Sequence, residues 1–165
     1  MVLVLLHDYI EKVCPIHGIS QVSENEYRID FKDEATDEQK QEANNRLLAW
    51  PLEEAKLNKL KQIDAEWNTA IKSGWNSGQG ILGISGEDVA LLNGAYSLSK
   101  ETANMGLPLP PIITLDNQEI VFSDIQAMTL FMLQYGQYRS NLSKLYASRK
   151  RAVQNATTIE EIITI

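Results

Sequence analysis

The residues of this chain that come closest to a catalytic or metal site are a thiol and two imidazoles near the start. Cys14 and His17 lie three residues apart, and His7 precedes them. A structural zinc site needs four such ligands, and the sequence holds one cysteine and two histidines. A nucleophilic Cys–His pair needs a third group that orients the imidazole, and no residue is marked for that role. We therefore expect no metal, no catalytic residue and a buried or capping Cys14. An intermolecular disulfide through Cys14 is the open alternative.

A second pattern, Gly78-Gln-Gly-Ile-Leu-Gly83, has the letters of a dinucleotide-binding loop. That loop follows a buried strand and opens a helix in a βαβ unit, with an acidic residue about 20 positions later. Here a long helix with a polar face precedes the glycines, and more loop follows them. The context predicts a flexible loop between two helices and no cofactor.

The charged residues argue against two classes of function. The net charge is −7, which disfavours nucleic acid as a partner because that binding depends on neutralising phosphates. The carboxylates lie on predicted helix faces and first turns, away from the apolar surroundings that raise a pKa for acid–base catalysis. Residues 24–42 carry eight acidic and three basic residues, whereas residues 139–151 carry five basic and none acidic. This polarity favours head-to-tail contact or a charged partner, with two solvated helix faces as the alternative.

The apolar start, Met1 to Leu6, is too short for a membrane span and lacks the basic residues that precede a signal sequence. His7 and Asp8 interrupt it. We expect a protein that is made in the cytoplasm and has no membrane contact.

The elements that must position these residues are mostly helices. In the first third, apolar spacing predicts a helix over residues 3–13, a β-hairpin of 19–23 and 27–31 turning at Glu24-Asn25-Glu26, and a helix that begins with the capping box Thr36 to Gln39. Pro51 should break or kink this helix and start a new one.

The remaining residues predict further helices and one hairpin, in this order: a helix over 52–73, a glycine-rich break over 74–86, a helix over 87–104, a stiff segment over 106–111, a β-hairpin over 112–122 turning at Asp116-Asn117, a helix capped by Ser123 that ends near Asn155, and a short helix capped by Thr157 or Thr158. The longest helix has apolar residues at a spacing near 3.5, interrupted by Arg139 and Arg149. It either forms a seam with a second copy of the chain, giving a homo-oligomer, or packs within the chain.

The predicted fold class is α+β and predominantly helical. A small N-terminal helix, β-hairpin and helix occupy residues 1–50. A helical domain with one β-hairpin and a long C-terminal helix occupies residues 51–165.

Residues 59–165, about two thirds of the chain, resemble an uncharacterised domain found at the C-terminal ends of phage tail-fibre and tail-fibre-assembly proteins. The motifs that carry the resemblance occur in the family's order: Ile63 to Gly74, Leu91-Leu-Asn-Gly-Ala95 after Asp88, Thr114-Leu-Asp-Asn117 followed by Ile120 to Gln126, the long helix with Tyr135 and Tyr138, and Arg151 to Ile162. Residues 27–39 are similar to one stretch of small phage tail proteins. The sequence departs from the family at residues 76–86, where glycines replace a more polar loop.

The resemblance implies a non-enzymatic protein of the virion tail, made in the host cytoplasm, that contacts the tail fibre and neighbouring tail or baseplate proteins. The family brings no catalytic residues. Aromatic residues and arginine dominate the energetics of interfaces, so we expect the contact residues to be Trp67, Trp75, Tyr135, Tyr138 and Arg139. A tail-fibre assembly chaperone that leaves the virion is the alternative. A cell-envelope hydrolase using Cys14 and His17 and a host-cytoplasm adaptor from a prophage are less favoured.

Overall fold

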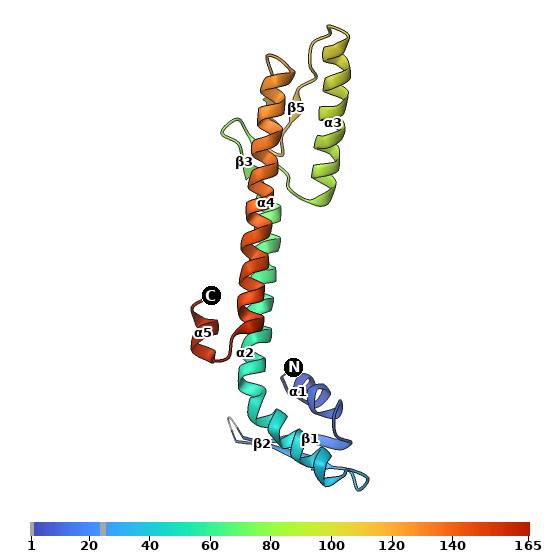
Figure 1. Cartoon of the computed structure of the whole chain (residues 1–165), viewed down its shortest axis with the longest axis vertical. Coiled ribbons are helices and arrows are strands. Elements are labelled where there is room, and N and C mark those ends of the chain that lie inside the picture. Colours follow the sequence, from blue (N-terminus) through green and yellow to red (C-terminus); the bar gives the residue numbers. More distant parts are fainter. Residues whose placement is uncertain (1, 24–25) are drawn as a thin grey trace. The chain divides into compact units, whose positions relative to one another are not determined.

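The computed structural model describes residues 2–23 and 26–165 and shows an α+β chain that is predominantly helical, as the sequence predicts (Figure 1). Its elements in chain order are α1 (Val2–Glu11), β1 (Ile16–Ser23), β2 (Glu26–Phe31), α2 (Asp37–Ser73), β3 (Trp75–Asn76), β4 (Ile81–Leu82), α3 (Gly86–Asn104), β5 (Ile112–Ile113), β6 (Glu119–Ile120), α4 (Ile125–Asn155) and α5 (Ile159–Ile163). The strands pair as the two-stranded antiparallel hairpins β1–β2, β3–β4 and β5–β6.

Packing divides the chain into two compact units. Unit 1 comprises Met1–Asn58 and Ala156–Thr164, and unit 2 comprises Lys59–Asn155 and Ile165. The division concerns packing alone, so a boundary between two domains near Pro51 stays a prediction.

Unit 1 is built around a small apolar core that α1, the β1–β2 hairpin and the first part of α2 share. Leu6 and Ile10 of α1 are fully buried, and Ala43 and Trp50 of α2 lie seven residues apart in the same core. The capping box at Thr36 is confirmed, since Gln39 N–H donates to Thr36 Oγ1 at 3.2 Å and the Gln39 side chain accepts from Thr36 N–H at 2.9 Å. Of the predicted turn between the strands, Glu24 and Asn25 lie outside the described residues.

Of the two predicted effects of Pro51, a break with a new helix beginning there is wrong, and a kink stays a prediction. α2 continues through this proline as one helix from Asp37 to Ser73. Proline removes one backbone donor and its ring crowds the preceding turn, which costs about 3 kcal/mol in a helix interior. Pro51 itself is exposed, whereas Trp50 beside it is 2% exposed, so burial of the apolar stripe of α2 offsets the cost.

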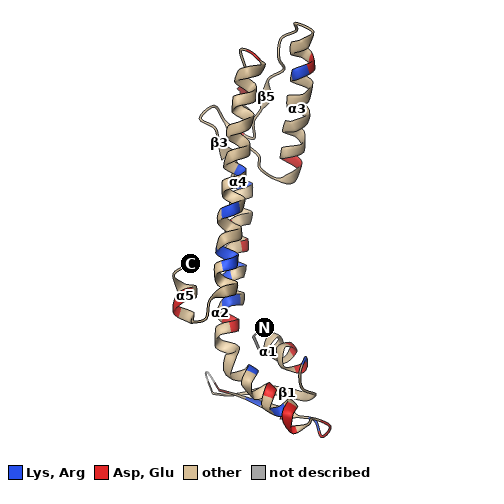
Figure 2. Cartoon of the chain, viewed as in Figure 1, with Lys and Arg blue, Asp and Glu red and all other residues tan. Residues whose placement is uncertain are grey.

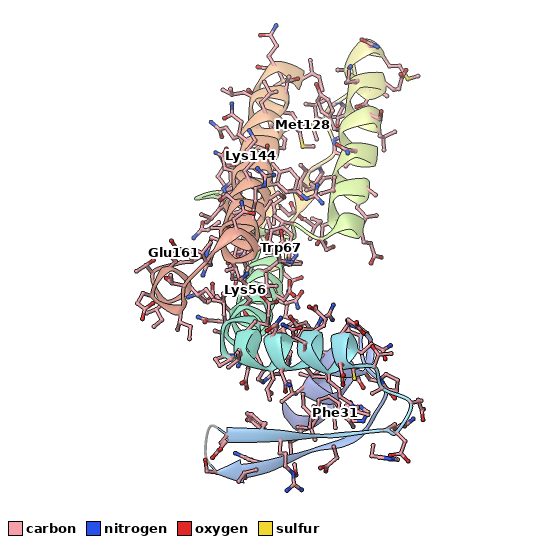
Figure 3. The ribbon with its side chains drawn as sticks, turned by 60° about the horizontal axis from the view of Figure 1, so that its bottom comes forward. Phe31, Lys56, Trp67, Met128, Lys144 and Glu161 are labelled. Atoms are coloured by element: carbon pink, nitrogen blue, oxygen red, sulfur yellow. The ribbon has the colours of Figure 1, made fainter. Side chains whose placement is uncertain are left out.

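Unit 2 consists of the last part of α2, both short hairpins, α3 and α4. α3 runs alongside the first half of α4, where the Tyr96 and Thr129 hydroxyls lie 2.8 Å apart (Figure 1). Met128, fully buried, points from α4 into this packing layer (Figure 3). The second half of α4 runs alongside residues 59–73 of α2, and Trp67 meets Tyr146 there edge to face at 5.2 Å. The core of unit 2 therefore forms where α4 meets α3 and the two hairpins.

The glycine-rich segment after α2 is more ordered than the sequence suggests. Residues 75–76 and 81–82 pair as β3 and β4, in place of the expected open loop. Gly74 ends α2 at φ +71, a left-handed conformation that only glycine adopts at little cost. The predicted hairpin over 112–122 is present, with two residues in each strand and Asn117 at φ 57 in its turn.

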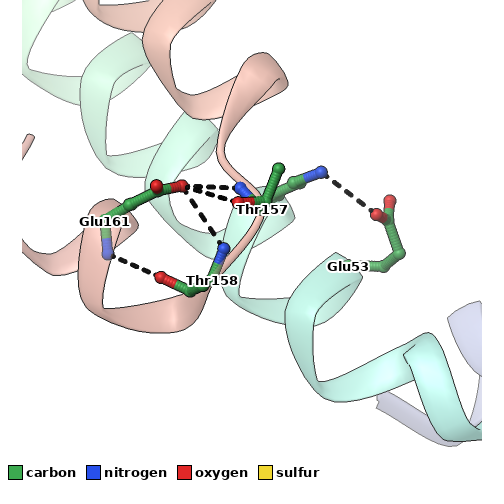
Figure 4. Close-up of polar contacts among 5 residues, drawn as sticks. Glu53, Thr157, Thr158 and Glu161 are labelled. Atoms are coloured by element: carbon green, nitrogen blue, oxygen red, sulfur yellow. Dashed lines mark hydrogen bonds and ion pairs between the residues drawn. The ribbon is translucent and has the colours of Figure 1, made fainter.

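Side-chain caps mark the N-termini of the remaining helices. α3 begins with a capping box of Ser85 and Asp88. α4 begins at Ile125, and its N-cap is Asp124 rather than the predicted Ser123, because the Asp124 carboxylate accepts from Ala127 N–H at 2.8 Å. α5 has the predicted cap: Glu161 N–H donates to Thr158 Oγ1, and the Glu161 carboxylate accepts from the backbone of Thr158 (Figure 4).

Candidate interaction surface

Three of the predicted contact residues meet in one aromatic cluster of unit 2. The ring of Trp75, on β3, lies 5.3 Å from Phe131, 5.8 Å from Tyr135 and 6.0 Å from Tyr138, all on α4. Tyr135 is 3% exposed, and Trp75 and Tyr138 are half-buried. The cluster attaches the β3–β4 hairpin to α4.

The polar groups of the same α4 face hold the segment that leads into α3. Tyr135 donates its hydroxyl to the Gly83 carbonyl at 2.8 Å, and Arg139 Nε donates to the Ile84 carbonyl at 3.2 Å. The Tyr138 hydroxyl reaches the Gly74 carbonyl at 3.5 Å. Burial raises the pKa of Tyr135 above its ordinary value. The segment is thus tethered to α4 on both sides of its short hairpin.

Trp67 lies apart from this cluster, on α2. Its neighbours are Tyr146 and an ion pair in which Arg149 donates to the Glu66 carboxylate at 2.5 Å. The hydrogen bond from Arg149 lowers the pKa of Glu66. Arg149, which interrupts the apolar spacing of α4, therefore pairs within the chain.

Each predicted contact residue thus has a partner inside unit 2, and a role in binding another protein stays a prediction for all five. The structure brings Trp75, Tyr135, Tyr138 and Arg139 together and leaves Trp67 elsewhere.

An apolar groove that the sequence did not predict lies between α3 and the β5–β6 hairpin. We call it the α3–hairpin groove, and its volume is about 180 Å³. Leu91, Ile113 and Leu115 line it and are 68%, 60% and 56% exposed. Leu92 and Ile112, which also line it, are buried and form its floor. One signal in the sequence pointed here: in the pair Leu91-Leu92 only one leucine can face the core, and Leu92 fits the apolar stripe of the helix.

Among the described residues, no hydrogen bond joins the Cys14 thiol to the imidazole of His7 or His17. Cys14 is 1% exposed and its Sγ lies 3.7 Å from the Pro15 carbonyl, whereas His17 is exposed. Burial raises the pKa of the Cys14 thiol, which disfavours the thiolate. His7 Nδ1 instead lies 3.9 Å from Asp8 and 3.7 Å from Glu11, which are exposed carboxylates on α1. These three side chains offer one ligand fewer than a closed zinc site needs.

Comparisons of the chain with protein-family models, with curated proteins and with solved structures find no match. Within residues 2–23 and 26–165, none of the helices combines the length and apolar character needed to cross a membrane.

Proposed function

We propose that this chain is a non-enzymatic phage tail protein that associates with the tail fibre and acts by protein–protein contact, as a structural or adaptor component of the virion tail. The ordered motifs that resemble the tail-fibre domain fall in unit 2 and in the segment that ends at α5. They supply the elements around the α3–hairpin groove, because Leu91 belongs to one motif and Leu115 to another.

The observation that carries the proposal is the exposure of Leu91, Ile113 and Leu115 at one groove. Single exposed leucines are ordinary on a protein surface, but several around one concave site mark a place for contact. Fully burying an exposed leucine or isoleucine is worth about 1.5–3 kcal/mol, and these three side chains still have more than half of their surface to bury, so together they can anchor a partner. The groove is lined mainly by aliphatic side chains, with Asp88 engaged in the cap of α3.

The experiment is quantitative mass spectrometry of purified phage particles that carry the chain or a variant. We expect the wild-type chain at a copy number comparable to that of the fibre protein. Leu91→Asp and Leu115→Asp should lower the copy number at least about tenfold, because an ionised carboxylate cannot be buried in an apolar interface. Leu98→Asp is the matched control, since Leu98 is 57% exposed on α3 and lies outside the groove.

Three results would change the conclusion. A chain that is absent from particles while its deletion leaves fibres malformed would be an assembly chaperone. A chain that is absent from particles with normal tails would refute both roles. If Leu98→Asp is lost as completely as the groove variants, the groove is not the contact site.

A further inference from the structure

α3 has a second concave surface on its other side, facing α4. We call it the Arg139 cleft; it has a volume of about 450 Å³. Val89 and Asn93 of α3 form one wall, and Met132 and Arg139 belong to the wall on α4. We propose that the Arg139 cleft binds the carboxylate of a glutamate or aspartate side chain presented by a protein partner.

One hydrogen bond holds the guanidinium of Arg139 in place, and its other donors have no partner among the described residues. Its Nε donates to the Ile84 carbonyl at 3.2 Å, which fixes the plane of the group. Among the residues that the structure describes, no carboxylate pairs with Arg139, although the side chain is half-buried. The two terminal nitrogens remain for an acceptor from outside, and a carboxylate matches their fork geometry.

Other polar residues of the cleft carry further hydrogen-bond donors for the same ligand. Ser140 and Ser143 of α4 and Asn93 of α3 line the cleft and carry hydroxyl and amide donors. Val89 and Met132 add apolar wall beside them. This combination suits an acidic residue that is flanked by an apolar one in a peptide segment.

Local charge favours a carboxylate over a phosphate. From Arg139 onward α4 carries five basic and no acidic residues up to Arg151, which Figure 2 shows as a blue stretch. The first turn of α3, however, holds Glu87 and Asp88. The Asp88 carboxylate accepts from Ser85 N–H at 2.9 Å, and among the described residues it forms no ion pair with Arg139. Its negative charge and that of Glu87 remain, and they repel a dianion more strongly than a single carboxylate.

The choice of a protein partner rests on the proposed function, in which this chain acts by protein–protein contact. Binding to the cleft can nevertheless be measured without the fibre. Particle mass spectrometry tests the proposed function, and peptide binding tests the cleft. Failure of either one therefore leaves the other result standing.

The test uses the ¹⁵N-labelled full chain and NMR titration with two capped peptides, acetyl-Leu-Glu-Leu-amide and acetyl-Leu-Gln-Leu-amide. We expect the Glu peptide to shift the Arg139 Nε–H signal and the amides of residues 136–143 in a saturable way. The Gln peptide should bind at least about tenfold more weakly, because it offers no charge to the guanidinium. Inorganic phosphate, as a third probe, should bind more weakly than the Glu peptide.

Two variants keep the proposal falsifiable. Arg139→Gln should weaken the Glu peptide at least about tenfold, but it also removes the tether to Ile84. Gly136→Met leaves Arg139 in place. A Cβ at Gly136 would meet nothing within 4 Å, so the larger side chain should be tolerated, and because Gly136 lines the cleft we expect the methionine to occupy it. It should abolish binding while the spectrum stays that of the folded chain.

Three results would overturn the proposal: equal binding of the Glu and Gln peptides, tighter binding of phosphate than of the Glu peptide, or shifts that persist in Gly136→Met. The absence of any saturable shift at about 10 mM peptide, well above a millimolar Kd, would overturn it as well.

Discussion

Replacing Gly83 by alanine should destabilise unit 2, although the added group is one methyl. An ideal Cβ at Gly83 would overlap the carboxyl group of Asp88. That carboxyl cannot move freely, because it accepts from Ser85 N–H at 2.9 Å within the capping box of α3. The Gly83 backbone is equally fixed, since its carbonyl accepts from the buried Tyr135 hydroxyl. Either the cap opens or the tether to α4 shifts.

The expected cost combines two known penalties. Loss of a helix cap costs about 1 kcal/mol, and overpacking of a well-packed site costs about 1–3 kcal/mol. Gly83→Ala should therefore lower the free energy of opening of unit 2 by about 2–4 kcal/mol. Gly94→Ala is the matched control: a Cβ there meets nothing within 4 Å, and alanine in a helix interior should stabilise by about 0.5–1 kcal/mol.

Native-state hydrogen exchange followed by mass spectrometry measures the free energy of local opening in both variants. Peptides over residues 86–99 report on α3, and peptides over residues 5–14 in unit 1 serve as an internal reference. The double variant Gly83→Ala/Asp88→Ala should lose less free energy of opening than the two single variants lose in sum, because alanine at position 88 removes the carboxyl group that the new Cβ would overlap. Unchanged protection of α3 in Gly83→Ala, or strict additivity in the double variant, would refute the reasoning.

Other predictions concern single side chains. Tyr135→Phe should cost unit 2 about 1–3 kcal/mol by hydrogen exchange, since a buried carbonyl loses its donor. Tyr138→Phe, whose hydroxyl bond measures 3.5 Å, should cost less than about 0.5 kcal/mol; equal losses would contradict this. Burial raises the pKa of Tyr135 in the folded state, so the contribution of its hydroxyl to the free energy of unfolding is complete below pH 10.0 and is lost as the pH rises further. Urea titrations at about pH 9 and pH 11 should show this loss of stability in the wild-type chain and not in Tyr135→Phe. Pro51→Ala should raise the urea midpoint by restoring a helical donor worth about 1–3 kcal/mol, and a lower midpoint would count against this. Asn117→Val should lower thermal stability by about 1–2 kcal/mol because a β-branched residue resists φ 57, whereas Asn117→Gly should not.

Local signals in the sequence predicted most of the helices and their caps. Thr36 with Gln39 and Thr158 with Glu161 form capping boxes whose spacing is visible in the sequence. The positive φ of Asn117 follows from the turn preference of Asp-Asn pairs. These features depend on neighbours within four residues, which is why sequence alone suffices for them.

The failures have long-range causes. Local propensity favours a break at Pro51, but burial of Trp50 and Ala43 on one stripe keeps α2 continuous. The β3–β4 hairpin depends on Trp75 reaching α4, 56 or more residues away in sequence, and no local pattern reveals that contact. The α3–hairpin groove joins Leu91 to Leu115 for the same reason, so only the folded chain displays it.

The bond between the two short hairpins has a consequence for how this chain can change in evolution. Leu115 N–H donates to the Ile81 carbonyl at 2.8 Å, so the two ends of the segment between them, residues 82–114, are held together. We call this segment, which contains α3 and the proline-rich stretch after it, the excursion. Its tip, residues 104–108, is exposed, and Gly106 at φ +70 completes the turn there. Insertions at this tip lengthen the excursion and leave the anchoring hairpins where they are, because closing a somewhat longer loop costs little. We therefore expect this chain to tolerate changes of length best at residues 104–108, while the helices that support the segment stay the same.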